Sequence, residues 1–364
     1  MADTKKVQKQ TAAYRLVADD NGYADHKFAW YSDDGTILTG KVPSLIQVGG
    51  VGLGKTTGER VGAYMCDGVE YTCSAAINDR MDIRNADYPT SVANRVLFNH
   101  GLTRFGLLGI PVRAALTLPI RDFFSDGGVI NTALRTASAE SLSKRNVEVV
   151  GCEAQPDVVS VQIYAEALSA WFDWAMTDTG DYSQDYIEME ETLGEVLVVD
   201  VGGSTTDLLS VQMINETGDG EMIINNGKSG TEKVGVIDAK AKLEELIRKK
   251  MQSEGIEGIS GHGSTFPSHW LERVLSTGKA SYSGRTWDFT EERDTACRGV
   301  AERISGFIKT RVGSTATYQS ILVVGGGAIV FRKWLELLLP NADFKDEFAN
   351  ARGLLKFMNS QQQV

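Results

Sequence analysis

Three glycine-rich segments, each at the end of a short apolar run typical of a β-strand, most constrain how this chain can fold. They are residues 20–27 (DNGYADHK), residues 200–207 (DVGGSTTD) and residues 325–328 (GGGA). Glycines let backbone N–H groups approach an anion closely, and the first two segments also begin with a carboxylate. Magnesium bound together with phosphates commonly takes one or two carboxylates and several waters. The sequence therefore predicts two facing hairpin loops around the phosphates of a nucleotide, with the third loop near the nucleoside.

The second segment is more specific than an ordinary turn. Gly202, Gly203 and Ser204 favour a tight turn in any hairpin. A turn alone does not require an aspartate at both ends or two adjacent threonines, and this segment has both. The D-x-G-x-x-x-x-K pattern of the first segment is common by chance. The order of all three segments along the chain, more than any one of them, indicates a nucleotide site.

Length and charge bound the class of protein. The 364 residues exceed one typical domain core, so we expect two domains. Apolar residues make up 42% and charged residues 23%, which is typical of a soluble globular protein. The net charge of −11 argues against a nonspecific DNA-binding surface, because such a surface requires clustered Lys and Arg. The sequence has no run of about 18 apolar residues, so we expect no membrane span.

The cysteines and the first residues bear on the cellular compartment. Cys66, Cys73, Cys152 and Cys297 form no C-x-x-C pair, and the four histidines do not cluster with them. We therefore expect reduced thiols, no zinc or disulfide framework, and a cytoplasmic protein. Residues 1–12 are polar and carry lysines without an apolar stretch, which is typical of a disordered arm and not of a signal peptide.

The apolar pattern predicts strands in the first third of the chain and a long helix in the middle. Short β-like runs follow one another in the first third, and Asp67 and Gly68 join two of them in a hairpin. After Pro156, apolar residues recur at helical spacing from Val161 to Ala175. We therefore expect one amphipathic helix there, crossing from the first domain to the second.

The chain resembles the actin-type ATPases, and among them the ParM (StbA-type) proteins that segregate bacterial plasmids. The resemblance covers most of the chain and rests on residues 20–27, residues 116–119 (LTLP), Glu153 shortly before Pro156, residues 200–207 and residues 323–328. It implies an α/β protein with the actin-like fold, in which two duplicated ribonuclease H-like domains enclose an ATP cleft. One departure is that Tyr23 and Ala24 follow Gly22, where the family usually has hydroxyl residues.

The resemblance also implies a division of the chain. Residues 13–176 would form domain I, with a small subdomain at about 42–80, and residues 177–329 would form domain II. Residues 330–364 would return to domain I as C-terminal helices.

A role for each loop follows from the same resemblance. The phosphates of ATP, or of GTP, would lie between the two hairpin loops, and Asp20 and Asp200 would hold Mg²⁺ through water. Glu153 would orient the attacking water. The expected nucleotide-binding residues are Asp20, Gly22, Tyr23, Lys27, Asp200, Gly202, Gly203, Ser204, Thr205, Gly325, Gly326 and Gly327.

A ParM-like protein would hydrolyse ATP and polymerise into filaments that move or segregate plasmid DNA. Its partners would be further copies of itself and a basic adaptor protein, bound to the plasmid and docked at the filament end, without direct contact between the filament protein and DNA. A non-polymerising small-molecule kinase of the same fold is the alternative, because a fold does not determine a function.

A second phosphate-loop pattern competes with this interpretation. Residues 49–56 (GGVGLGKT) fit the P-loop pattern G-x-x-x-x-G-K-[ST] at every position. A P-loop works only when a strand precedes it and a helix follows, because the helix N-terminus holds the phosphate. Residues 57–64 (TGERVGAY) contain two glycines and no helical apolar spacing. We therefore expect a loop of the small subdomain here, with a P-loop NTPase as the less favoured alternative.

Overall fold

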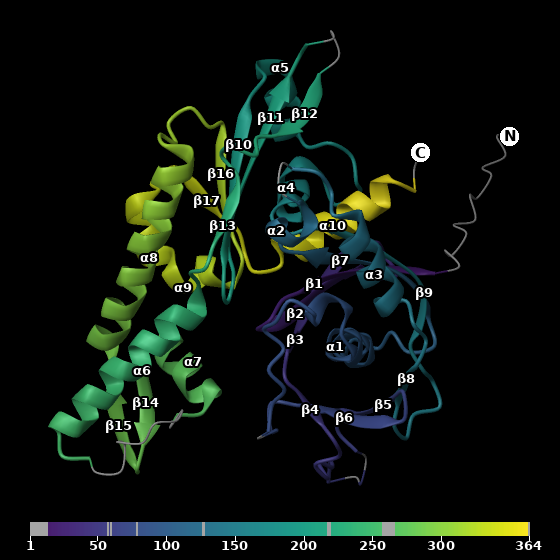
Figure 1. Ribbon diagram of the computed structural model, residues 1–364, viewed down its shortest axis with the longest axis vertical. Helices are drawn as coiled ribbons and strands as arrows, with labels where there is room; N and C mark the ends of the chain where they lie inside the picture. The colour runs from purple at the N-terminus through teal and green to yellow at the C-terminus, as the bar shows by residue number, and fades with distance from the viewer. Residues whose placement is uncertain are drawn as a thin grey trace, which may run out of the picture.

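Two mixed sheets with the same strand order form the centre of the molecule (Figure 1). The computed structural model describes residues 14–362 except 57, 59, 78, 126–127, 217–219 and 257–265. The first sheet has the order β3-β2-β1-β7-β9, built from β1 (Arg15–Asn21), β2 (Asp25–Tyr31), β3 (Ile37–Pro43), β7 (Pro111–Leu118) and β9 (Asp157–Ala165). The second has the order β12-β11-β10-β16-β17, built from β10 (Glu195–Val201), β11 (Thr206–Ile214), β12 (Glu221–Ile224), β16 (Ser320–Val324) and β17 (Ala342–Phe344), with β13 (Gly230–Glu232) paired to β11.

The two sheets repeat one pairing scheme. In each, the first two strands form an antiparallel hairpin, β1 with β2 and β10 with β11. The first strand of each also runs parallel to a later one, β1 beside β7 and β10 beside β16. Parallel neighbours end at the same edge of a sheet, so the loops that follow them gather there. This repetition confirms the predicted α/β actin-like fold with duplicated units.

A smaller sheet lies beyond the first one, with the order β4-β6-β5-β8. It contains β4 (Ile46–Val48), β5 (Ala63–Cys66), β6 (Val69–Cys73) and β8 (Val147–Val149). The hairpin of β5 and β6 turns at Asp67 and Gly68, which both have positive φ, as the sequence predicts. Helix α1 (Val92–Arg104) lies between the two sheets, with Leu97 packed toward the small sheet and Phe98 toward the first.

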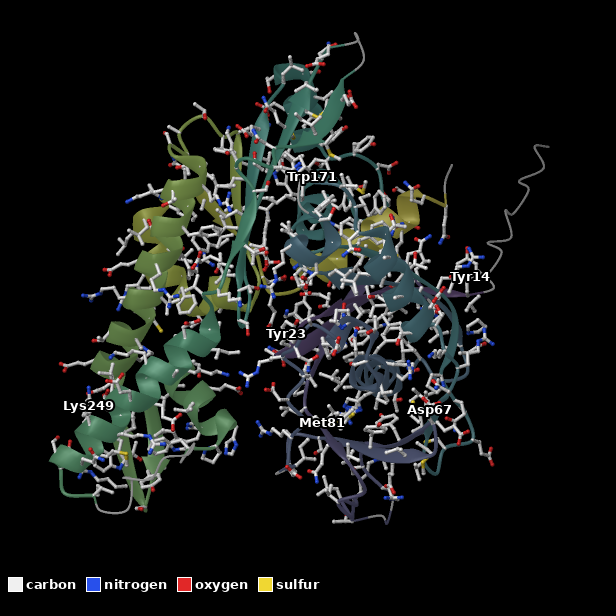
Figure 2. The ribbon with its side chains drawn as sticks, viewed as in Figure 1. Tyr14, Tyr23, Asp67, Met81, Trp171 and Lys249 are labelled. Carbon is white, nitrogen blue, oxygen red and sulfur yellow. The ribbon has the colours of Figure 1, made fainter. Side chains whose placement is uncertain are left out.

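Two helices lie between the first and second sheets. They are α4 (Leu168–Ala175) and α10 (Ala349–Ser360), which pack against each other (Figure 1). Trp171 of α4 is buried against the second sheet, and Figure 2 labels it there. Leu354 of α10 is buried against β1 and β2 of the first sheet. The two helices therefore share their apolar surface between both sheets.

The remaining elements cover the outer faces. In the first half they are the 3₁₀ helix η1 (Tyr88–Thr90), α2 (Ile120–Phe123) and α3 (Thr132–Leu142); in the second they are α5 (Gln184–Thr192), α6 (Val236–Ser253), α7 (Ser268–Thr277), the hairpin of β14 (Lys279–Tyr282) and β15 (Arg285–Asp288), α8 (Thr290–Val312) and α9 (Gly326–Leu338). Throughout the part of the chain that the structure describes, every helix is too short or too polar to cross a membrane.

The predicted long helix after Pro156 is wrong over its first half. Residues 157–165 form β9, which pairs in parallel with β7, and only Leu168–Ala175 are helical, as α4. Val158, Val161 and Ile163 are buried in the first sheet. β-Branched residues pack well on a pleated surface, and here the pairing with β7 outweighs a pattern that also fits a helix.

The predicted domain limits stay a prediction, and one stretch lies elsewhere than expected. Residues 330–338 belong to α9, which packs on the second sheet, and residues 342–344 form the edge strand β17 of that sheet. Only α10, from residue 349 onward, packs against the first sheet. The predicted arm, residues 1–12, lies outside the described residues.

Candidate functional site

The hairpins β1–β2 and β10–β11 place their charged residues in the same register. Asp20 lies opposite Lys27 in the first hairpin, and Asp200 lies opposite Asp207 in the second. The strands that carry Asp20 and Asp200 are buried and pair with parallel neighbours. Each aspartate therefore lies at the edge of its sheet where the loops gather.

The first hairpin carries a paired charge. Lys27 Nζ lies 2.9 Å from Asp20 Oδ2, and the side chains are 13% and 6% exposed. Burial alone would lower the pKa of Lys27, but the charge and hydrogen bond of Asp20 and the charge of Asp200 outweigh it, so the pKa lies above its ordinary value. Lys27 therefore stays charged at the edge of the first sheet, available to an anion.

A buried network supports the first hairpin from below. His26 Nδ1 lies 2.7 Å from Asp19 Oδ2, and its Nε2 lies 2.7 Å from the hydroxyl of Tyr88. The ring of Tyr23 packs 5.2 Å from that of Tyr88, centroid to centroid, and Figure 2 shows Tyr23 at the tip of the hairpin. The Ser44 hydroxyl donates to the carbonyl of Gly22 at 2.6 Å. The loop that carries Tyr23 is therefore anchored to the small-sheet side of the molecule.

The second hairpin carries two carboxylates with raised pKa values. Burial, together with the charge of Asp20, raises the pKa of Asp200 to about 6. Burial also raises the pKa of Asp207 to about 7, and the charge of Asp200 adds to the effect while the hydrogen bond from Thr231 opposes it. Crowded carboxylates of this kind are stabilised in their charged form when a cation binds among them.

Glu166 joins these groups, although the sequence patterns did not single it out. It follows β9 and immediately precedes the turn into α4. Burial raises the pKa of Glu166 well above its ordinary value, and the charges of Asp20, Asp207 and Asp200 act in the same direction. The signal in the sequence is residues 158–163 (VVSVQI), four of which are β-branched, since a strand there would end close to Glu166.

Glu153, the residue expected to orient water, lies at the other edge of the first sheet. It is exposed in the loop between β8 and β9. This loop folds back onto the small sheet, where Gln155 Oε1 accepts a hydrogen bond from the backbone of Val149 at 2.6 Å. Because β9 runs parallel to β7 and β1, its start and end are separated by the length of the strand, about 30 Å. Glu166, and not Glu153, lies at the edge that carries Asp20.

The two glycine loops of the hairpins approach each other. A Cβ added at Gly203 would lie 3.5 Å from the Cβ of Ala24 across the gap between the halves. The second loop is closed by a hydrogen bond from Gly202 N to the carbonyl of Thr205 at 2.8 Å, which leaves Ser204 at its tip. These loops are therefore close enough for one ligand to contact both.

The third glycine segment packs against the end of β10. A Cβ at Gly325, where φ is +84°, would lie 2.5 Å from Asp200 Oδ1, and one at Gly327 would lie 2.4 Å from Val201 Cγ1. A Cβ at Gly326 would meet nothing within 4 Å. Close packing thus requires glycine at 325 and 327, while Gly326 begins α9 next to open space.

The P-loop pattern does not have the structure that its chemistry requires. Strand β4 precedes residues 49–56, but Gly54 then forms an antiparallel bridge with Arg60, and Val61 N donates to the carbonyl of Leu53. In the described residues between 49 and 62 no helix follows the glycines. Without a helix N-terminus, this loop cannot hold a phosphate in the manner of a P-loop.

Metal binding at the site would need more than protein side chains. Among the described residues, no three His, Cys, Asp or Glu side chains converge closely enough to hold a metal ion. Asp20 and Asp200 come from different halves and carry the carboxylates nearest the two loops. This donor set fits a hard cation that keeps most of its waters or bridges to phosphates.

Two family models match the chain. The model for the N-terminal part of the plasmid segregation protein ParM matches residues 15–176. The model for the C-terminal part of the MreB-like archaeal actin homologues matches residues 198–337. A comparison with curated protein sequences gives no match.

Solved structures agree with these matches. A 15-stranded ParM filament from Clostridium botulinum is 19% identical, with a TM-score of 0.72 over 96% of this chain and 99% of that one. The archaeal actin homologue Ta0583 is 18% identical, with a TM-score of 0.71 over 96% of this chain and 100% of that one. The complex of Ta0583 with ADP is 18% identical, with a TM-score of 0.67 over 96% and 99%. The repeated sheets, the two family models and these structures lead to one conclusion: the chain has the actin-like fold, with residues 15–176 similar to the N-terminal part of ParM and residues 198–337 similar to the C-terminal part of the archaeal MreB-like actin homologues.

Proposed function

We propose that this protein is an ATPase that polymerises and uses the site between its two halves to bind and hydrolyse ATP. The observation that carries the proposal is the convergence of charged groups from both sheets. Asp20 and Lys27 come from the first hairpin, and Asp200 and Asp207 come from the second. A ligand held by both hairpins would connect the two halves. Hydrolysis of that ligand would therefore change the relative orientation of the halves.

The phosphates would lie between the two glycine loops. Backbone N–H groups of residues 23–24 and 203–205 would donate to phosphate oxygens, and Lys27 would offset their charge. The side chains of Tyr23 and Ala24 offer the phosphates no short hydroxyl, so Lys27 and the backbone carry the contact on this side. Gly326 would allow the backbone at the start of α9 to approach the nucleoside.

The carboxylates fit a magnesium–nucleotide complex. Asp200, Asp207 and Glu166 each have a raised pKa to which the charge of a neighbouring carboxylate contributes. Asp20 and Asp200 would hold Mg²⁺ through water, as the first interpretation of the sequence expected. When bound, the ion would offset the charge of the phosphates.

Glu166 replaces Glu153 as the residue proposed to orient the attacking water. The charges of Asp20, Asp207 and Asp200 reach it and help to raise its pKa, which gives it the basicity of a general base. Phosphoryl transfer needs little else from the protein than positioning and charge stabilisation. GTP stays an alternative substrate, since the groups described here contact phosphates and not the base.

Filament formation and a role in plasmid segregation are proposed from the likeness to ParM. Support comes from the N-terminal match to the plasmid segregation protein ParM and from the fold shared with a ParM filament at 19% identity. The small-molecule kinase is the second candidate, and it would act without assembling.

Light scattering of the purified protein separates the two candidates. With Mg²⁺ and ATP, a polymerising ATPase should scatter more light at once and then less as phosphate is released. Hydrolysis without any rise in scattering at concentrations well above those of the enzyme assay would contradict polymerisation. Phosphoryl transfer to a small molecule in place of water would favour the kinase.

The proposed partner is a basic adaptor protein that links the filament end to plasmid DNA. The net charge of −11 is unfavourable for direct phosphate contact. The protein alone should therefore leave random duplex DNA unshifted at physiological ionic strength. A salt-sensitive shift by the protein alone would contradict this, and failure to recover any DNA-binding protein with it from cells carrying the same replicon would count against the segregation role.

A further inference from the structure

The side chain of Asn350 joins three parts of the molecule. It lies in the first turn of α10 and is 3% exposed. Its Nδ2 donates to Asp200 Oδ2 at 2.6 Å, and its Oδ1 accepts from the backbone N–H groups of Ala167 and Ala170 at 3.1 Å each. One buried amide therefore connects the end of β10, the turn after β9 and the C-terminal helix.

The packing of α10 on α4 has its own polar contacts. Arg352 Nη2 lies 2.7 Å from Asp173 Oδ2, and Lys356 Nζ lies 2.8 Å from Asp173 Oδ1. The ring of Phe357 on α10 also stacks on that of Phe172 on α4, with centroids 4.2 Å apart. Holding the two helices together does not require an asparagine at position 350, and burying an amide is unfavourable unless all its groups are paired. The distinctive contact of Asn350 is the one with Asp200.

The backbone that Asn350 holds is strained. Ala167 has φ 59° and ψ −42°, and Leu168 N donates to the carbonyl of Glu166 at 2.6 Å. This is a γ-turn with positive φ, a rare conformation for a residue other than glycine. Such a turn persists only where surrounding contacts fix it. The hydrogen bond from Ala167 N to Asn350 is one of those contacts, and the turn sets where Glu166 points.

We infer that Asn350 is a positioning residue that couples Asp200 to Glu166. A ligand that binds the Asp200 carboxylate weakens or replaces its hydrogen bond with Asn350 Nδ2. The amide of Asn350 then shifts, and its Oδ1 atom moves the turn at Ala167 and the start of α4 with it. Asn350 also ties this event to α10, which packs against the first sheet. The inference rests on the proposed function, because it assigns Asp200 and Glu166 to one nucleotide site.

Replacing Asn350 with leucine tests the coupling, since Leu has the same branched shape and makes no hydrogen bond. N350L should lower kcat for ATP about 100-fold, because Glu166 is no longer fixed, while weakening ATP binding about tenfold or less. Arg352→Gln is the matched control on the same helix. It should lower the melting temperature and leave kcat within about twofold of wild type, because Arg352 contacts only Asp173 and Asp346 among the groups described.

Hydrogen exchange gives a readout that a merely structural role would not move. In the wild type, Mg²⁺ and ADP should slow exchange in a peptide covering residues 166–170, whose amides at 167 and 170 bond to Asn350. N350L should lose this nucleotide-dependent protection, and R352Q should keep it. Should N350L fail to fold, N350S carries the same prediction with no added bulk.

The two failures are distinguishable. A wild-type protein that neither hydrolyses ATP nor responds to the nucleotide would overturn the proposed function and the coupling with it. A wild type that does both, beside an N350L variant with unchanged kcat and unchanged protection, would overturn the coupling alone.

Discussion

Lys27 and Asp207 occupy the same position in the two repeated hairpins, each directly opposite the aspartate at the end of the preceding strand. The first hairpin therefore pairs Asp20 with a cation, while the second places two carboxylates side by side. Only the first hairpin can offset phosphate charge with this side chain. The second depends on a cation brought by the ligand, because burial and a neighbouring carboxylate raise the pKa values of both Asp200 and Asp207.

Lys27→Ala is expected to weaken ATP binding about tenfold or more, because a buried charge-assisted contact is lost. Titration calorimetry in the presence of Mg²⁺ measures the change. Lys55→Ala, in the P-loop pattern, is the matched control and should bind ATP like the wild type. The reverse result, with Lys55 essential and Lys27 dispensable, would move the nucleotide site to residues 49–56.

Asp200→Ala is expected to abolish Mg²⁺-dependent ATP binding, since it removes the carboxylate of the second hairpin closest to the first. Calorimetry with Mg²⁺ and with EDTA separates the metal-dependent part of the affinity. Asp185→Ala, at an exposed position on α5, serves as the control and should change neither value. Equal affinity of D200A and wild type in Mg²⁺ would remove Asp200 from the site.

Glu166→Gln is expected to bind ATP normally and to hydrolyse it about 10²- to 10⁴-fold more slowly, because the amide keeps the shape but not the basicity. Glu153→Gln should behave like the wild type. Phosphate release after a single addition of ATP gives the rate, and light scattering should decay more slowly for E166Q. If E153Q were the slow variant, Glu153 and not Glu166 would orient the attacking water.

His100 makes the stability of the first half depend on pH. Burial, together with the charge of Arg104, lowers the pKa of His100 from 6.5 to about 4, and its Nδ1 lies 2.8 Å from the Tyr64 hydroxyl. Between these values the unfolded chain binds a proton that the folded chain does not. The stabilisation is therefore complete above pH 6.5 and is lost as the pH falls toward 4, by about 2 kcal/mol between pH 7 and pH 5.

Denaturant unfolding at several pH values checks this contribution. His100→Gln keeps an acceptor for Tyr64 but does not titrate in this range. Between pH 7 and pH 5 the wild type should lose about 2 kcal/mol of unfolding free energy relative to H100Q. Parallel curves for the two proteins would mean that His100 titrates in the folded state as it does in the unfolded chain.

Local signals in the sequence were enough to predict the two hairpins but not to identify Glu166, which precedes the turn at Ala167. The glycines and aspartates of residues 20–27 and 200–207 define turns within a few positions, and their strands follow from adjacent apolar residues. Residues 157–165 satisfy both a helical and a strand pattern, and the choice is made by β7, more than 40 positions earlier in the chain. That misassignment concealed Glu166 and favoured Glu153.

The contacts of Asn350 were beyond any local reading of the sequence. Its partner Asp200 lies 150 positions away, and nothing in residues 349–353 (ANARG) marks a polar role. An asparagine in the first turn of a helix is ordinary, so only the packing of α10 against α4 and β10 gives it meaning. Long-range partners of this kind follow from the fold and not from spacing.

The shared layer of α4 and α10 limits how the two halves can move. Each sheet buries apolar side chains against these helices, Trp171 on one side and Leu354 on the other. Drawing the sheets apart would expose both surfaces to water, which is unfavourable in proportion to the area uncovered. Sliding or turning about the helices keeps them covered. The layer of α4 and α10 therefore permits the two halves to rotate and opposes their separation.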